Sequence, residues 1–219
     1  MIVFSTARTH RNPGQVLNCA VADLRALERY ILEVVEVQQH EPSLQAHHDA
    51  ARLVHHMIEL LRAHVGRLDV HLAGLRHRAP EETGDVSRSV AGVFVGFICK
   101  MRSHEASHLL RDDYTLLSLA MMGYTILHTT GLALDDRETA GIALEHLREL
   151  TVLSREIGLS MPGVVVDELS VGLDLPNRTA DKCALANLQG LHTHGRYRRD
   201  PPALRSCNSQ SAMPSLAKA

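Results

Sequence analysis

The sequence predicts an all-α protein built as a bundle of long antiparallel helices. Apolar residues recur at helical spacing over three long segments, which is typical of helices that bury one face. Between two of these segments, the stretch from Tyr114 to Leu134 contains no formally charged side chain. Aromatic residues make up only 3% of the chain and Trp is absent, so the core has to be built from aliphatic side chains, which favours helices over strands.

The first long helix is expected from Gln15 to Gln39, after a turn at Asn12-Pro13-Gly14. Its apolar residues fall on one face at about 100° per residue. They are Leu17, Val21, Leu24, Leu27, Ile31, Val34 and Val35. Glu28 lies within this face, between Leu24 and Ile31, so it is the acidic residue of this helix that the pattern predicts to be buried.

A second, longer helix is expected from Leu44 to His77, after a break at His40-Glu41-Pro42. One apolar stripe runs along it, and many histidines accompany the stripe. These are His47, His48, His55, His56, His64, His71 and His77. His56 and Glu59 project away from the stripe, so we expect them to face solvent, whereas His64 points inward.

The apolar stretch from Tyr114 to Leu134 has the length of a membrane span, but we expect the central helix of a bundle. Both of its flanks carry two Asp and one Arg, with no basic bias to one side. Its neighbours are amphipathic, so they can bury it on nearly all sides. A short helix that begins at Asp85 or Ser87 and ends near Lys100, followed by a polar break at residues 102–113, is expected before it.

The fourth long helix is expected from Arg137 to Ile157, with Gly158 as its C-terminal stop. On this helix His146 falls at the edge of the apolar face, whereas Glu145 and Glu149 fall on the polar face. An extra short helix is expected at residues 162–173. We therefore expect a loose N-terminus at residues 1–14, a helical bundle at residues 15–173 and a basic, disordered tail at residues 174–219.

Composition and motifs exclude several classes of function. A formal net charge of -2 argues against nucleic acid as a partner of the whole chain. The four cysteines are far apart and form no C-x-x-C pair, and the glycine-rich and nucleophile motifs of common enzymes are missing. No small-molecule substrate is indicated, and an enzyme is not expected. Because the N-terminal segment lacks a long apolar run, we expect a cytoplasmic protein without a membrane partner.

The order of long and short helices, together with the segment from Arg111 to Leu150, resembles the bacterial ferritin-like proteins of the YciF type. The resemblance covers roughly residues 17–169. It implies a ferritin-like antiparallel four-helix bundle whose core can carry a dinuclear metal site. Such a site needs about four carboxylates and two histidines, commonly as Glu-x-x-His on two helices, and neither the second nor the fourth expected helix has that motif.

The inward-facing polar residues are instead Glu28, His64, His128 and His146, with Tyr124 nearby. One carboxylate and three histidines do not make a di-iron site, so two hypotheses remain open. The first is a non-catalytic ferritin-like bundle with a degenerate metal centre, which forms a homo-oligomer and has a stress-related role implied by the resemblance. The second is a metalloprotein that binds iron or zinc through Glu28 and the core histidines.

Overall fold

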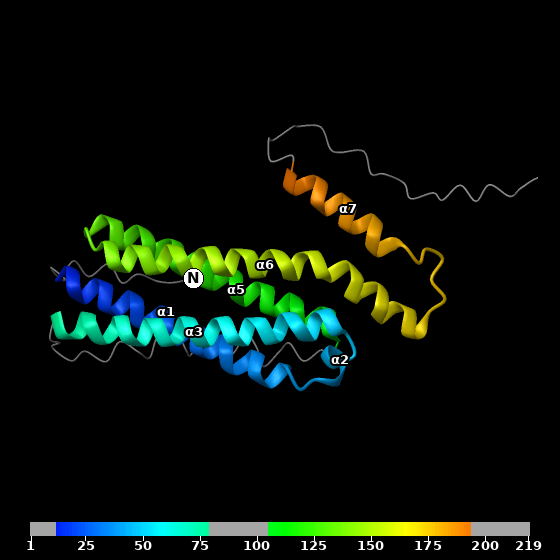
Figure 1. Ribbon diagram of the computed structural model, residues 1–219, viewed down its shortest axis with the longest axis horizontal. Coiled ribbons are helices and arrows are strands. Elements are labelled where there is room, and N and C mark those ends of the chain that lie inside the picture. The colour runs from blue at the N-terminus through cyan, green and yellow to red at the C-terminus, as the bar shows by residue number, and fades with distance from the viewer. Residues whose placement is uncertain (1–11, 79–104, 194–219) are drawn as a thin grey trace, which may run out of the picture. The chain divides into compact units, whose positions relative to one another are not determined.

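The computed structural model describes residues 12–78 and 105–193, and all regular structure in these ranges is helical (Figure 1), as the sequence predicts. The helices are α1 (Pro13–Gln38), α2 (Pro42–Gln45), α3 (His48–Arg78), α5 (Ala106–Ala133), α6 (Arg137–Gly172) and α7 (Ala180–Thr193). The expected short helix between residues 85 and 100 and most of the expected loose N-terminus lie outside the described residues. The chain divides into two compact units, residues 1–160 and residues 161–219.

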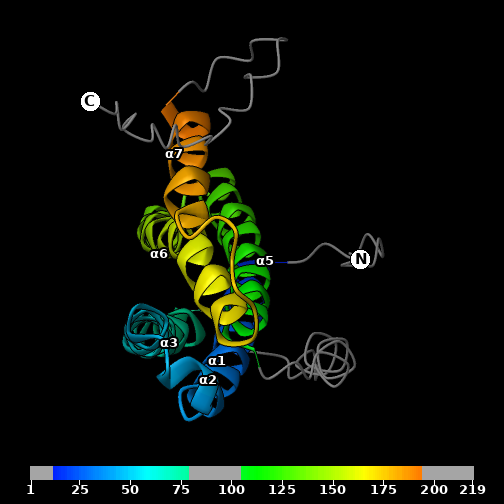
Figure 2. The same cartoon turned by 90° about the vertical axis from the view of Figure 1, so that its right-hand side faces the viewer.

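In the first unit, α1, α3, α5 and α6 run side by side (Figures 1 and 2). Side-chain contacts join α1 to α3 and to α5, and join α6 to the same two helices. Between α1 and α3 the contacts are Glu36–Arg62 and Glu28–His64; between α3 and α6 they are His56–Glu156, Arg67–Glu145 and His71–Thr139. Between α1 and α5 they are Gln38–Asp113 and Leu24–Gly123, and between α5 and α6 they are Met121–Thr151 and Tyr124–His146.

In every one of these pairs the residue number rises along one helix and falls along the other, so all four contacts are antiparallel. Consequently α3 runs parallel to α5, and α1 runs parallel to α6. A groove at one end of the unit confirms this, because it is lined by Leu17 and Leu75 together with Leu134 and Glu138. The C-terminal end of α3 and the N-terminal end of α5 therefore lie at opposite ends of the unit.

Several helix boundaries differ from the sequence prediction. The second predicted helix is divided into α2 and α3, and the break falls at Ala46 and His47. The predicted stop at Gly158 is wrong, because α6 continues to Gly172 with Pro162 inside it. Gly158 does not adopt the left-handed conformation that ends a helix. The helix continues through Pro162 although a proline removes one backbone hydrogen bond and its ring crowds the carbonyl four residues earlier.

The segment predicted as a disordered tail contains α7. Its residues, ADKCALANLQGLHT, are mostly good helix formers, and the side chain of Asn177 accepts a hydrogen bond from Thr179 N just before the helix begins (3.0 Å). The high content of Pro, Ser and Arg elsewhere in the tail concealed this local pattern. Residues 194–219 lie outside the described part of the chain.

The polar break predicted at residues 102–113 is also wrong in part, because α5 begins at Ala106. Asp112 and Asp113 lie inside the helix and are buried, with exposures of 8% and 0%. The Gln38 amide of α1 donates to both carboxylate oxygens of Asp113, at 2.7 and 3.2 Å. Burial raises the pKa of Asp113 to about 8, so near pH 7 this residue is largely a neutral acid that the core can accommodate.

The central helix is not buried on nearly all sides, which corrects the sequence prediction. Its inner face contributes Leu117, Ala120 and Tyr124 to the core, each with an exposure of 0%. On its outer face, Met122 and Leu132 are 59% and 60% exposed. Among the described residues, α5 is the one helix that is long and apolar enough to cross a membrane, by length and composition only.

Close contact between α5 and α6 depends on Gly131, where a Cβ atom would lie 2.8 Å from the backbone nitrogen of Ala140. We predict that Gly131→Ala lowers the free energy of unfolding by about 1–3 kcal/mol, because rigid backbone has to move apart. Gly141→Ala is the matched control, since it lies in α6 with nothing within 4 Å of its Cβ position and gains helix propensity. Chemical denaturation of both variants checks this, and equal stability would contradict it.

Candidate metal centre

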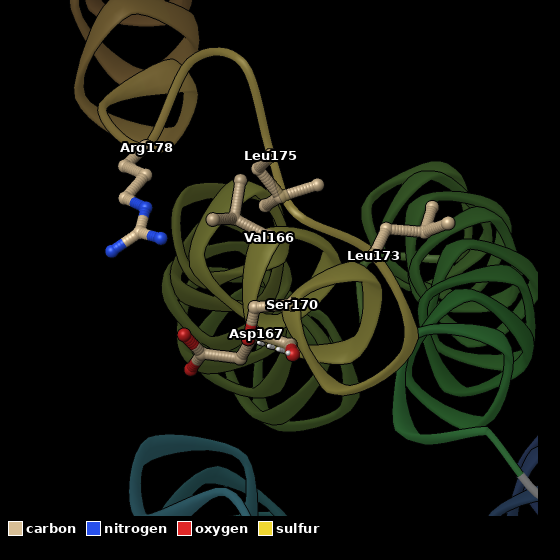
Figure 3. A pocket seen from close by; sticks show the side chains of 6 residues that line it. All are labelled: Val166, Asp167, Ser170, Leu173, Leu175 and Arg178. Carbon is tan, nitrogen blue, oxygen red and sulfur yellow. Dashed lines mark hydrogen bonds between the residues drawn. The ribbon is translucent and has the colours of Figure 1, made fainter.

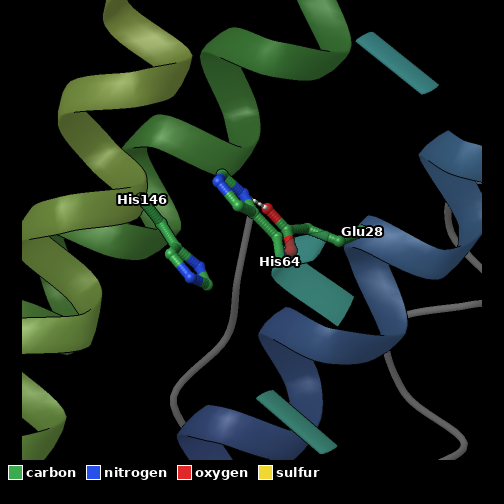
Figure 4. Close-up of side chains that lie close together, drawn as sticks. All are labelled: Glu28, His64 and His146. Atoms are coloured by element: carbon green, nitrogen blue, oxygen red, sulfur yellow. Dashed lines mark hydrogen bonds and ion pairs between the residues drawn. The ribbon is translucent and has the colours of Figure 1, made fainter. Parts of the chain in front are cut away.

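Three buried side chains from three helices meet in the core of the first unit (Figure 4). They are Glu28 of α1, His64 of α3 and His146 of α6, with exposures of 0%, 1% and 0%. One potential ligand atom from each of them lies within 4.8 Å of the others. The helical pattern of α1 predicts the burial of Glu28, and the structure confirms it.

His64 occupies the centre of this cluster because both of its ring nitrogens face carboxylates. Nδ1 lies 3.0 Å from Glu28 Oε1, and Nε2 lies 2.8 Å from Glu149 Oε2. An imidazole ring can make a hydrogen bond at each of its two nitrogens, and both nitrogens of His64 have a partner here. The ring therefore joins α1 to α6.

His146 lies flat against His64, with ring centroids 3.7 Å apart and an angle of 3° between the planes. Its Nδ1 lies 2.8 Å from the Tyr124 hydroxyl, which comes from α5. Burial, and then the nearby positive charges of His64 and Arg67, lower the pKa of His146 to about 3. This imidazole is therefore neutral at neutral pH, which is the form that binds metals.

Two buried polar atoms of the cluster have no hydrogen-bond partner, namely Glu28 Oε2 and His146 Nε2. Buried polar atoms are almost always paired, so these two atoms are open to a water molecule or an ion. When His146 Nδ1 donates its proton to the Tyr124 hydroxyl, Nε2 keeps a lone pair that is available to a ligand. Burial and the negative charge of Glu28 raise the pKa of Tyr124, so it stays a neutral phenol.

The part played by Glu149 does not follow from the helical pattern. The pattern predicts Glu149 on the polar face with Glu145, and this is wrong, because Glu149 lies at the boundary of the core and contacts His64. Its side chain is 40% exposed, so it connects the buried cluster to the surface. The spacing His146-Leu-Arg-Glu149 is the signal that indicates this, since residues three apart share one side of a helix.

The other sequence-predicted residues lie elsewhere. His128 is only partly buried, and its Nδ1 donates to the backbone oxygen of Ala140 at 2.8 Å, so it does not join the cluster. His56 and Glu59 have side-chain exposures of 54% and 59%, as predicted. Glu145 is exposed and pairs with Arg67 at 2.5 Å, and this pair lowers the pKa of its carboxyl.

A separate groove lies in the second unit, but it offers no comparable set of ligands (Figure 3). Its volume is about 350 Å³, and it is lined by Val166, Asp167, Ser170, Leu173, Leu175 and Arg178. The Ser170 hydroxyl donates to the backbone oxygen of Asp167 at 2.7 Å, as Figure 3 shows. Within the described residues, the cluster around His64 is therefore the candidate functional site.

Comparisons with known proteins add nothing to this geometry, since no family model, curated protein or solved structure matches the chain.

The depressed pKa of His146 makes stability depend on pH. The unfolded chain binds a proton at this residue below about pH 6.5 and the folded chain does not, so stability falls as the pH drops from 6.5 to 3. We predict that His146→Gln removes this contribution, which amounts to at most about 1.4 kcal/mol per pH unit. Denaturation of the metal-free protein across this range measures it, with His56→Gln as the half-exposed control. Parallel curves for wild type and His146→Gln would contradict the prediction.

Proposed function

We propose that this chain is a metal-binding helical bundle that holds one iron or zinc ion with Glu28, His64 and His146. The observation that carries the proposal is the convergence of these three buried side chains, two of which present unpartnered atoms. Histidine nitrogen and carboxylate oxygen are ligands that both metals accept, and two histidines with one carboxylate form a known iron and zinc set. A single carboxylate at the centre supports one metal ion rather than two.

We further propose a ferritin-like arrangement for the first unit, as the resemblance implies. The antiparallel pairing of the four helices supports it, as does the placement of the ends of α3 and α5, since ferritin-like folds contain one long crossover connection. In this proposal, the dinuclear site of such bundles is reduced to a mononuclear one. The charge-free part of α5, residues 114–133, supports the reduction because it supplies a hydroxyl group from Tyr124 but no carboxylate.

Two of the proposed ligands have to move for an ion to bind. Metal ions bind imidazole nitrogens in the plane of the ring, and the planes of His64 and His146 are parallel and separate. One ring therefore has to rotate, and the His64 nitrogen that binds the ion has to give up its hydrogen bond to a carboxylate together with any proton that it carries. Glu149 is the partner to be released, because it is the exposed one and solvent can satisfy it.

The hydrogen bonds of His64 favour a second candidate function, in which the cluster binds no metal and serves only to align the helices. Both ring nitrogens of His64 already have partners, so this residue needs no ion to be satisfied. Buried charged networks can select one packing arrangement over others, although they do not always do so. In this alternative the bundle is non-catalytic, as the first sequence-based hypothesis states.

Metal analysis of protein purified without a histidine tag separates the two candidates. We predict close to one iron or zinc ion per chain, which is lost in Glu28→Ala and in His146→Ala. Glu28→Gln keeps the shape and a hydrogen-bond acceptor for His64, so it distinguishes loss of a ligand from loss of the fold. Tyr124→Phe should weaken binding about 10–100-fold, since it removes the group that orients His146.

The matched controls are Glu33→Ala on the exposed face of α1 and His56→Ala on the exposed face of α3. These should retain the metal, whereas loss of metal from His56→Ala alone would indicate adventitious surface binding. Folded wild-type protein that contains no metal and takes up none from added iron(II) or zinc would overturn the metal proposal and leave the structural one.

A further inference from the structure

The outer face of α5 carries an exposed stripe that contains no charged side chain. Its residues are Thr115, Ser118, Met122, Thr125, Thr129 and Leu132, all of them exposed except Ser118, which is partly buried. The spacings along the stripe alternate between three and four residues, which is the pattern of a helix that packs along a second helix. At 1.5 Å per residue the stripe is roughly 26 Å long.

The polar atoms of this stripe are already satisfied within the helix. The hydroxyls of Ser118, Thr125 and Thr129 donate to the backbone oxygens four residues earlier, at 2.7, 2.9 and 2.9 Å. Thr115 does the same at 3.0 Å. A partner that covers the stripe would therefore bury no unpaired hydroxyl donor, so the usual cost of burying polar groups is avoided.

We infer that this face binds the same face of a second copy of the chain, with the two α5 helices antiparallel. The steps of three, four, three, four and three residues read the same from either end, so the stripe is complementary to itself about a twofold axis. In that register Met122 lies opposite Thr125 of the second copy, Ser118 lies opposite Thr129, and Thr115 lies opposite Leu132. Each contact then occurs twice.

The charged residues at the two ends of the stripe agree with this register. Arg111, at the N-terminal end, bonds Asp112 of its own chain, yet its side chain is 55% exposed. In the antiparallel pair it lies opposite Asp135 and Asp136 at the C-terminal end of the other copy. Asp135 lies 3.9 Å from Arg137 of its own chain, but at 93% exposure its carboxylate is still accessible to a second cation. Opposite charges therefore meet at both ends of the seam, where they favour this orientation.

A lipid surface is a poorer match for the same face. Helices that lie on membranes carry Lys and Arg along their polar side, where they meet anionic lipids. No Lys or Arg lies along this stripe, and the exposed carboxylate of Asp135 lies at its C-terminal end. The charge pattern thus suits a copy of this chain better than an acidic membrane.

Sedimentation equilibrium of the full chain tests the inference. We expect wild type to be a dimer and Met122→Lys to dissociate at least about 100-fold more readily, because two lysines are buried close to the axis. The double variant Met122→Lys/Thr125→Glu should recover dimerisation, since each lysine then faces a glutamate of the other copy. Thr125→Lys is the second disrupting variant, and circular dichroism checks that each variant remains helical.

Val70→Lys is the matched control, because Val70 is a 76% exposed apolar residue of α3 outside the stripe. It should dimerise like wild type. A monomeric wild type would overturn the inference, whether or not it binds anionic vesicles, because the face would then be covered by a membrane or by another part of the chain. A dimer that survives Met122→Lys and Thr125→Lys would place the interface elsewhere and also overturn it.

Discussion

The position of His64 is the constraint on which the structure of the first unit depends. Its ring lies in an aliphatic core, where a polar group is costly unless it is hydrogen-bonded. Glu28 from α1 and Glu149 from α6 supply that pairing, and His146 covers one face of the ring. A shift of any of the three helices by one residue would leave a buried charge without a partner, so the cluster defines how α1, α3 and α6 align.

The fourth helix of the unit has a different role. It contributes the Tyr124 hydroxyl to the cluster and otherwise presents apolar and small side chains in both directions. Inward, these pack against α1 and α6, and Gly131 allows its backbone to approach Ala140 closely. Outward, they form the stripe that we assign to a second copy. Two contact surfaces, rather than burial all around, thus explain why residues 114–133 of this helix carry no charge.

Periodicity was sufficient to predict the long helices and the burial of Glu28 and His64, because both follow from the angle between residues on one helix. Periodicity could not predict the contact between Glu149 and His64. A side chain at the edge of a helix's apolar face can turn toward the core or toward solvent, and its partner on another helix decides which. The same limit applies to His128, which points toward α6 but bonds a backbone oxygen there. The charged residues before Tyr114 suggest a break between helices. The helix continues through them because Asp113 is buried as a largely neutral acid.

X-ray absorption spectroscopy of protein loaded with iron or zinc tests most directly whether the cluster around His64 binds a metal ion through two imidazoles and one carboxylate, as we propose. We predict two imidazole nitrogens at about 2.0–2.1 Å from the ion, with carboxylate or water oxygen completing the shell, and loss of one imidazole signal in His146→Ala. A spectrum with only water and carboxylate oxygens, or one that His146→Ala leaves unchanged, would contradict the account.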